Sequence, residues 1–146
     1  MHHAELSDLR FIYGLFASRR DVFPHVRQDK LKRQTLAGQC IFEANVAITY
    51  QTYKRRTRVG DIDIPSGAVM LHQIINATQF NGAGSRVFER FFHEIVVPSG
   101  GDLYLTVRTE NSVACQFYER HGMRVVGNVA WSRGTIPGLI YSRTRR

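Results

Sequence analysis

The middle of the chain places an apolar strand, a glycine-containing loop and an amphipathic helix in direct succession, and this order most constrains the fold. The apolar run over 69–77 predicts a buried strand, and residues 85–97 predict a helix with one apolar face. Gly82 and Gly84 between them allow a tight turn and a close approach of backbone N–H groups to a ligand. A helix that starts after such a loop favours an anion, best of all phosphate, although a plain turn would use the same glycines.

Three familiar motifs are excluded by the residues around this loop and helix. The dinucleotide-binding fingerprint needs a third glycine where the chain has Val87. A Walker A loop needs a lysine after its last glycine, and none follows Gly84. The pair His93-Glu94 lacks the second histidine, at position 97, of a zinc protease helix. The sequence therefore predicts no metal site.

The rest of the chain predicts alternating strands and helices without repeats or a linker. We expect strands over 2–6, 40–42, 46–53, 69–77, 103–107, 123–131 and 139–142. We expect helices starting at Ser7 or Asp8 and running over 24–36, 85–97 and 111–121. Residues 54–67 are expected to form a loop. This order predicts an α/β architecture with a mixed sheet in one domain.

Charge and cysteine content narrow the classes of function. The 146 residues carry 20 Lys+Arg and 12 Asp+Glu, and the net charge of +8 indicates a polyanionic partner such as nucleic acid, a phosphorylated cofactor or an anionic membrane surface. No stretch approaches the roughly 18 apolar residues of a membrane span, and the start does not resemble a signal peptide. Cys40 and Cys115 are expected to be buried free thiols. We therefore expect a soluble, cytoplasmic protein with no membrane partner.

A second motif begins directly after the strand at 103–107 and reads N-S-V-A-C-Q-F-Y-E-R-H-G-M from Asn111 to Met123. It resembles motif B of the GNAT superfamily of N-acetyltransferases, N-x-x-A-x-x-F/Y-Y-x-x-x-G-F, with methionine in place of the last phenylalanine. The earlier loop is similar to motif A, Q/R-x-x-G-x-G/A, through Gln79, Gly82 and Gly84. The start, 4–12, is similar to the opening strand and first helix of the family. The resemblance thus covers essentially the whole chain.

The resemblance implies a fold and an activity. It implies one GNAT domain over 1–146, with a mixed, mostly antiparallel central sheet splayed at two parallel strands and helices on both faces. It implies transfer of an acetyl group from acetyl-CoA to a primary amine by direct attack in a ternary complex. The acceptor stays open between a small molecule, a peptide and an RNA-linked amine, and the resemblance is compatible with a homodimer.

The resemblance also assigns residues to acetyl-CoA, which is expected where the strands at 69–77 and 103–108 part. Contacts to the pantetheine arm and thioester fall mainly to the backbone of His72, Gln73 and Ile74. Contacts to the pyrophosphate fall to the loop and the start of the helix, that is, to Gln79, Phe80, Asn81, Gly82, Ala83, Gly84, Ser85 and Arg86. Contacts to the far side of the pantetheine and to the sulfur are assigned to Asn111, Ala114, Phe117 and Tyr118. Independently of the resemblance, Asn111 is suited to a helix cap and Phe117 to core packing.

Catalysis requires a base for the amine and a proton for the departing thiolate. Tyr118 matches the position of a tyrosine general acid in the family, and a packed tyrosine is the alternative. The glutamate base of the histone acetyltransferases corresponds to Ala68, so that mechanism does not carry over. His72 and Glu43 are the remaining candidates for the base, beside ordered water, and His72 can equally be a core histidine.

Two alternatives to an active enzyme remain open at this point. One is a CoA-binding module that has the same fold but no catalytic activity. The alanine at the position of the glutamate base is compatible with this alternative. The other is a basic nucleic-acid-binding module that uses Lys54-Arg55-Arg56 with Arg58 and the tail over 143–146. Such clusters are also common on solvated surfaces.

Overall fold

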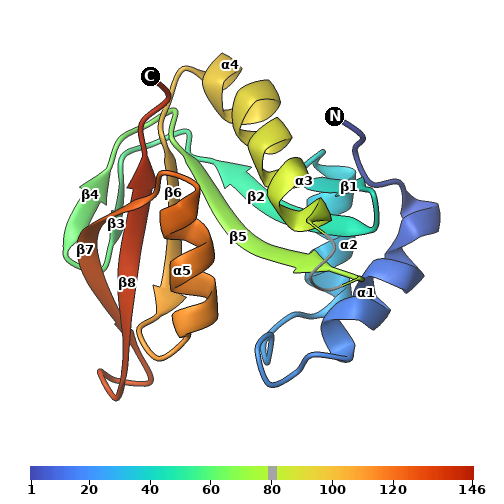
Figure 1. The fold of residues 1–146 in the computed structure, drawn as a ribbon, viewed down its shortest axis with the longest axis horizontal. Helices are drawn as coiled ribbons and strands as arrows, with labels where there is room; N and C mark the ends of the chain where they lie inside the picture. The colour runs from blue at the N-terminus through green and yellow to red at the C-terminus, as the bar shows by residue number, and fades with distance from the viewer. Residues whose placement is uncertain (79–81) are drawn as a thin grey trace. The chain divides into compact units, whose positions relative to one another are not determined.

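The computed structural model describes residues 1–78 and 82–146 of the chain. Figure 1 shows its elements, which in chain order are η1 (Leu6–Asp8), α1 (Leu9–Ala17), α2 (Gln28–Leu36), β1 (Cys40–Glu43), β2 (Val46–Thr52), β3 (Thr57–Val59), β4 (Ile62–Ile64), β5 (Val69–Asn76), α3 (Ala83–Phe91), the π-helical η2 (Phe92–Val96), α4 (Val97–Ser99), β6 (Leu103–Arg108), α5 (Ser112–Arg120), β7 (Arg124–Trp131) and β8 (Ile136–Arg143). None of these described helices is long and apolar enough to cross a membrane.

Six strands belong to one sheet in the order β1-β2-β5-β6-β8-β7, and β3 and β4 form a separate hairpin. The pairs β1–β2, β6–β8 and β7–β8 are antiparallel, whereas β5 and β6 are parallel. The parallel register runs from Val69 opposite Leu103 to Leu71 opposite Leu105. The structure thereby confirms the predicted α/β class with a mostly antiparallel sheet and one parallel pair.

The chain divides into two compact units, the first of which comprises 1–50 and 72–90. Its core forms because α1 carries Ile12 and Phe16 four positions apart on one face, where they meet Leu31 of α2. Cys40 of β1 completes this apolar cluster, and burial raises the pKa of its thiol to about 11. Cys40 is therefore a neutral packing residue, as predicted.

The hairpin of β1 and β2 in the first unit closes through Ala44 and Asn45, both with positive φ. Two successive residues in this conformation match the right-handed twist of the flanking strands. This turn fixes the register in which Glu43 lies opposite Val46.

The second unit comprises 51–71 and 91–146. In Figure 1, α5 lies alongside β8, and the Tyr141 hydroxyl of β8 donates a 2.7 Å hydrogen bond to the Glu119 carboxylate of α5. The turn between β3 and β4 docks on β7, where the Asp61 carboxylate accepts a 2.8 Å hydrogen bond from the backbone N–H of Asn128. A Cβ on Gly60 would lie 2.1 Å from the Asn128 carbonyl oxygen, so this close approach requires glycine.

The start of the chain differs from the predictions. A strand over 2–6 is wrong among the described residues, because this stretch makes only an isolated bridge between His3 and Ile41. The backbone N–H of Glu5 instead donates to the Asp8 carboxylate, which closes a capping box around the short helix η1. The second helix starts at Gln28, because Arg27 still has an extended backbone.

Two later segments also differ. The expected loop over 54–67 contains the hairpin of β3 and β4, which is too short for its alternation to stand out in the sequence. The helix expected over 85–97 runs from Ala83 through the π-helical stretch to Ser99. Pro98 is tolerated in the first turn of α4, where its missing N–H costs nothing, and Gly100 ends the helix in the left-handed conformation.

Candidate functional site

Two hydrogen bonds lie at the described ends of the segment between β5 and α3. The side-chain carbonyl of Asn76, the last residue of β5, accepts a 3.0 Å hydrogen bond from the Thr78 N–H. Gly82 has a φ of 77°, which favours glycine, and its carbonyl accepts a 3.2 Å hydrogen bond from the Arg86 N–H. α3 begins at Ala83. The predicted contacts of Gln79, Phe80 and Asn81 lie outside the described residues.

Arg86 folds back over Gly82. A Cβ built on Gly82 would lie 3.2 Å from Arg86 Nη1, which is tight for a side-chain contact. Arg86 is exposed, and no acidic side chain within the described ranges pairs with it. The residues therefore fit a pyrophosphate, because glycine leaves room for a guanidinium close to a helix N-terminus, where the dipole also favours an anion.

The three predicted residues of β5, His72, Gln73 and Ile74, are partly buried. The Gln73 side-chain oxygen accepts a hydrogen bond from the hydroxyl of Thr49, a polar residue that is fully buried. That bond ties the Gln73 side chain to the neighbouring element, so a ligand contact from Gln73 would come from its backbone.

Burial lowers the pKa of His72 from 6.5 to about 4, and the positive charge of Lys30 adds to this effect. The imidazole is consequently neutral near pH 7. Neutrality suits a proton acceptor, but a low pKa also makes the ring a weak base.

Glu43, the other candidate base, ends β1 in the same unit. Its carboxylate forms an ion pair with Arg90 of α3 and accepts a 3.2 Å hydrogen bond from the His2 backbone N–H. Both oxygens of the carboxylate are therefore already engaged, so an incoming amine would have to compete for them.

The second motif starts α5 in the second unit. The Asn111 side-chain oxygen accepts a 3.2 Å hydrogen bond from the Ala114 N–H, so Asn111 is the N-cap of this helix. Phe117 is partly buried and meets Tyr118 edge-on, with ring centroids 5.5 Å apart. Its ring also lies 4.7 Å from that of His121.

Tyr118 is the one buried residue of α5. Desolvation raises the pKa of its hydroxyl well above the usual value, with a smaller contribution from Cys115. The hydroxyl therefore stays protonated, which is the state from which a proton donor must start. Its ring lies 6.3 Å from that of Tyr141, a buried residue that the sequence reasoning missed.

Burial and the Glu119 carboxylate raise the pKa of Tyr141 as well. Tyr141 follows Leu139 and Ile140 in an apolar run of β8, so only its hydroxyl could have indicated a polar role. Arg90 was also missed, because nothing in the sequence connects a helix residue with Glu43, which precedes it by 47 positions.

Ala68 stands at the position that the resemblance assigns to the histone-type glutamate. It is only 2% exposed and packs in an apolar cluster with Ile64 and Met70. Its N–H donates to the Pro65 carbonyl, and its own carbonyl accepts from Tyr53. A carboxylate at this position would be desolvated, which agrees with the absence of the histone-type glutamate.

Two hollows in the described part of the chain have volumes of about 570 Å³ and about 410 Å³. Residues outside the predicted acetyl-CoA set line both of them. Within the described ranges, no three His, Cys, Asp or Glu side chains are grouped as metal ligands would be.

No protein-family model and no curated protein matches this sequence. Among solved structures, an acetyltransferase of the GNAT family from Bacillus cereus is 17% identical and has a TM-score of 0.72, with 97% of this chain and 94% of that chain covered. The ribosomal-protein-S18-alanine N-acetyltransferase from Escherichia coli is 15% identical and has a TM-score of 0.70, with coverage of 97% and 90%. A Salmonella typhimurium protein solved with its cofactor acetyl-CoA is 13% identical and has a TM-score of 0.70, with coverage of 99% and 92%. The chain thus has the fold of the GNAT N-acetyltransferases.

Proposed function

We propose that this protein is an N-acetyltransferase that transfers the acetyl group of acetyl-CoA directly to a primary amine. The observation that carries the proposal is the start of α3, where Arg86 lies against Gly82 beside a helix N-terminus. This arrangement suits the pyrophosphate of a CoA ester. The likeness in fold to a protein solved with acetyl-CoA supports the same ligand.

Each group of residues has a distinct role in this proposal. Gly82 and the first turn of α3 bind the pyrophosphate through backbone N–H groups, and Arg86 adds a charged contact. The backbone of His72, Gln73 and Ile74 orients the pantetheine arm. Bound acetyl-CoA supplies the thioester carbonyl that the amine attacks. Asn111 keeps α5 in place through its cap, and Ala114 and Phe117 provide an apolar contact for the arm.

Tyr118 donates the proton that the thiolate needs. Its burial keeps the hydroxyl protonated, but a raised pKa also slows proton transfer unless the thiolate is itself desolvated. Proton donation from Tyr118 therefore suits a site from which water is excluded.

His72 fits the role of the base better than Glu43. Its imidazole is neutral at neutral pH, whereas the Glu43 carboxylate is engaged in an ion pair with Arg90. With a pKa of about 4, the His72 imidazole does not retain the proton of the amine. It works best by passing that proton on to water.

A CoA-binding protein without catalytic activity is the second candidate. It is favoured by the alanine at position 68, which provides no carboxylate, and by the ion pair that engages the Glu43 carboxylate.

A nucleic-acid-binding module is less favoured. Arg56 and Arg58 of its basic cluster lie 3.2 and 3.5 Å from the carboxylate oxygens of Asp63, which offsets part of their charge.

Binding and turnover are tested separately. Acetyl-CoA should raise the melting temperature of the chain, because a ligand that prefers the folded state stabilises it. Arg86→Gln should reduce this shift, whereas Arg133→Gln, at another exposed arginine, should leave it unchanged. An unchanged melting temperature at saturating acetyl-CoA would contradict the proposal.

Thiol release from acetyl-CoA with a panel of amines, peptides and RNA then separates an enzyme from a binder. Release that depends on one acceptor class supports the transferase. Binding without release for any acceptor supports the inactive module.

A further inference from the structure

A groove of about 570 Å³ lies between α1 and the beginning of α2, within the first unit alone. Its apolar part consists of Leu9, Tyr13 and Val26. Three cationic side chains line it as well: Arg20, Arg27 and Lys32. None of these residues has a role in the proposed acetyl transfer, so that activity does not account for the groove.

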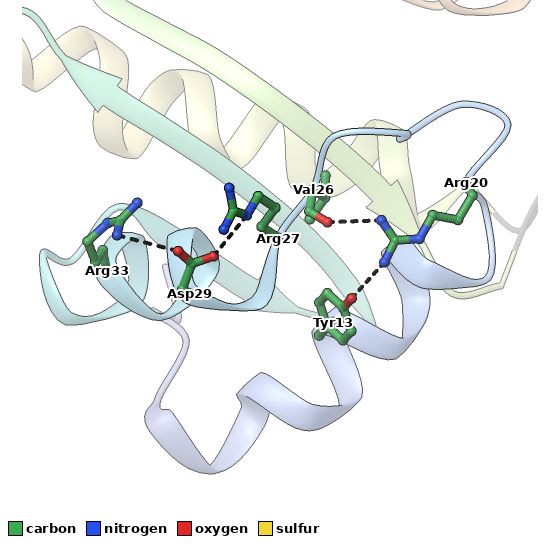
Figure 2. Close-up of polar contacts among 6 residues, drawn as sticks. All are labelled: Tyr13, Arg20, Val26, Arg27, Asp29 and Arg33. Atoms are coloured by element: carbon green, nitrogen blue, oxygen red, sulfur yellow. Dashed lines mark hydrogen bonds and ion pairs between the residues drawn. The ribbon is translucent and has the colours of Figure 1, made fainter.

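Arg20 is held in a fixed position at this groove (Figure 2). Its Nη2 donates a 2.6 Å hydrogen bond to the Tyr13 hydroxyl, and its Nη1 donates a 3.2 Å bond to the Val26 carbonyl. The guanidinium carbon also lies 5.7 Å from the centre of the Tyr13 ring. A guanidinium has five N–H donors, so donors remain for a ligand after these two bonds. The side chain is therefore preorganised to bind an anion.

The acidic residue of the groove does not cancel this charge. Asp29 lies 3.3 Å from Arg27 and 3.6 Å from Arg33, a residue of the next helical turn, so its carboxylate is already engaged (Figure 2). Lys32 is exposed and has no ion-pair partner in the part of the chain that the structure describes. The lining thus carries three cations against one paired carboxylate.

We propose that this groove binds an acidic segment of a partner protein. Carboxylates of the segment pair with Arg20 and Lys32, and a neighbouring apolar side chain packs on the partly exposed Leu9. The charged lining residues are exposed, so the groove is open, whereas small-molecule sites usually bury most of their ligand. An open, cationic groove with an apolar floor matches an extended chain better than a free metabolite.

The charge of the chain and the geometry of the Tyr13 ring disfavour two other occupants of the groove, a second copy of the chain and single-stranded nucleic acid. A second copy of the chain is a poor source of such a segment, since its 12 acidic residues are outnumbered by 20 basic ones. Single-stranded nucleic acid binds through bases stacked on aromatic faces, and the guanidinium of Arg20 covers one face of Tyr13. An acidic peptide needs no free aromatic face.

The test uses the full chain and fluorescence anisotropy without acetyl-CoA, so its result does not depend on the proposed function. The probe is a short labelled peptide of glutamate and leucine, compared with a peptide in which glutamine replaces glutamate. We expect the acidic peptide to bind and the glutamine peptide to bind at least about tenfold more weakly, with a loss of affinity as salt increases.

Lys32→Glu is the decisive variant, because Lys32 is exposed and its replacement leaves the core intact. It should weaken binding of the acidic peptide about tenfold, as it removes one attraction and adds one repulsion. Arg10→Glu, an equal charge change at an exposed position of α1 outside the groove, should change affinity less than about twofold.

A second variant tests how Arg20 is held. Tyr13→Phe removes the hydroxyl that accepts from Arg20 and should weaken binding a few-fold. The proposal is overturned if Lys32→Glu and Arg10→Glu have equal effects. It is also overturned if a small dicarboxylate or single-stranded RNA binds in a Lys32-dependent way while the acidic peptide does not.

Discussion

The partly buried imidazole of His72 predicts a specific loss of stability in mild acid. In the folded chain its pKa is about 4, and the ordinary value is 6.5. As the pH falls below 6.5, the unfolded chain binds a proton at this position and the folded chain does not. The stability associated with neutral His72 is therefore complete above 6.5 and is lost progressively between 6.5 and about 4.

The size of this loss follows from the shift. At about 1.4 kcal/mol for each pKa unit, a change from 6.5 to about 4 corresponds to about 3 kcal/mol. His72 is only partly buried, and water that reaches the ring reduces the penalty. We therefore expect a loss of about 2 kcal/mol in the free energy of unfolding, which is a substantial fraction of the stability of a small domain.

Urea unfolding at several pH values measures this loss, with His72→Gln as the variant. Other groups titrate in the same range, so the informative quantity is the difference between the two pH dependences. The unmodified chain should lose about 2 kcal/mol more than His72→Gln on going from neutral pH to about pH 4. His25→Gln, which removes an exposed histidine, should behave like the unmodified chain. Equal losses in the unmodified chain and His72→Gln would refute the reasoning.

Three further predictions concern the motifs and the sheet edge. Tyr118→Phe should lower turnover by about 100-fold or more while the affinity for acetyl-CoA changes little, and unchanged turnover in steady-state kinetics would remove the tyrosine from the acid role. Gly82→Ala, at a φ of 77°, should cost about 1 kcal/mol in thermal unfolding and weaken acetyl-CoA binding, whereas Gly14→Ala, in an open position on α1, should stabilise the chain by about 0.5–1 kcal/mol. Hydrogen bonds from Asn128 lower the pKa of Asp61, so Asp61→Asn should destabilise the chain near neutral pH and lose this effect below 3.8, as followed by chemical unfolding.

The sequence predicted the elements whose signals are local. The strand predicted over 69–77, the helix predicted from 85 and the cap at Asn111 depend on hydrophobic period, glycine and capping chemistry. Each is present, with the strand ending at Asn76 and the helix starting at Ala83. Errors occurred where a tertiary contact decides the structure. The segment 2–6 has strand-like residues, but its pairing with β1 is limited to the bridge between His3 and Ile41 and the hydrogen bonds beside it, because the short helix η1 already begins at Leu6.

The candidate site was predictable in part for the same reason. Motif positions such as Arg86 and Tyr118 could be assigned by resemblance, and their surroundings could not. The ion pair of Glu43 with Arg90 joins residues distant in sequence, and the low pKa of His72 results from burial and from Lys30 on another element. Spacing along the chain carries no information on either effect.

The docked turn between β3 and β4 has a consequence for solubility. β7 is the last strand of its sheet, and a bare strand edge pairs readily with another chain. Here Asp61 occupies both the N–H and the carbonyl of Asn128, and the bulge between Val125 and Gly127 disturbs the register beside them. Loosening this turn would expose a strand edge next to half-exposed valines, so such variants would aggregate through β7 while the rest of the chain is still folded.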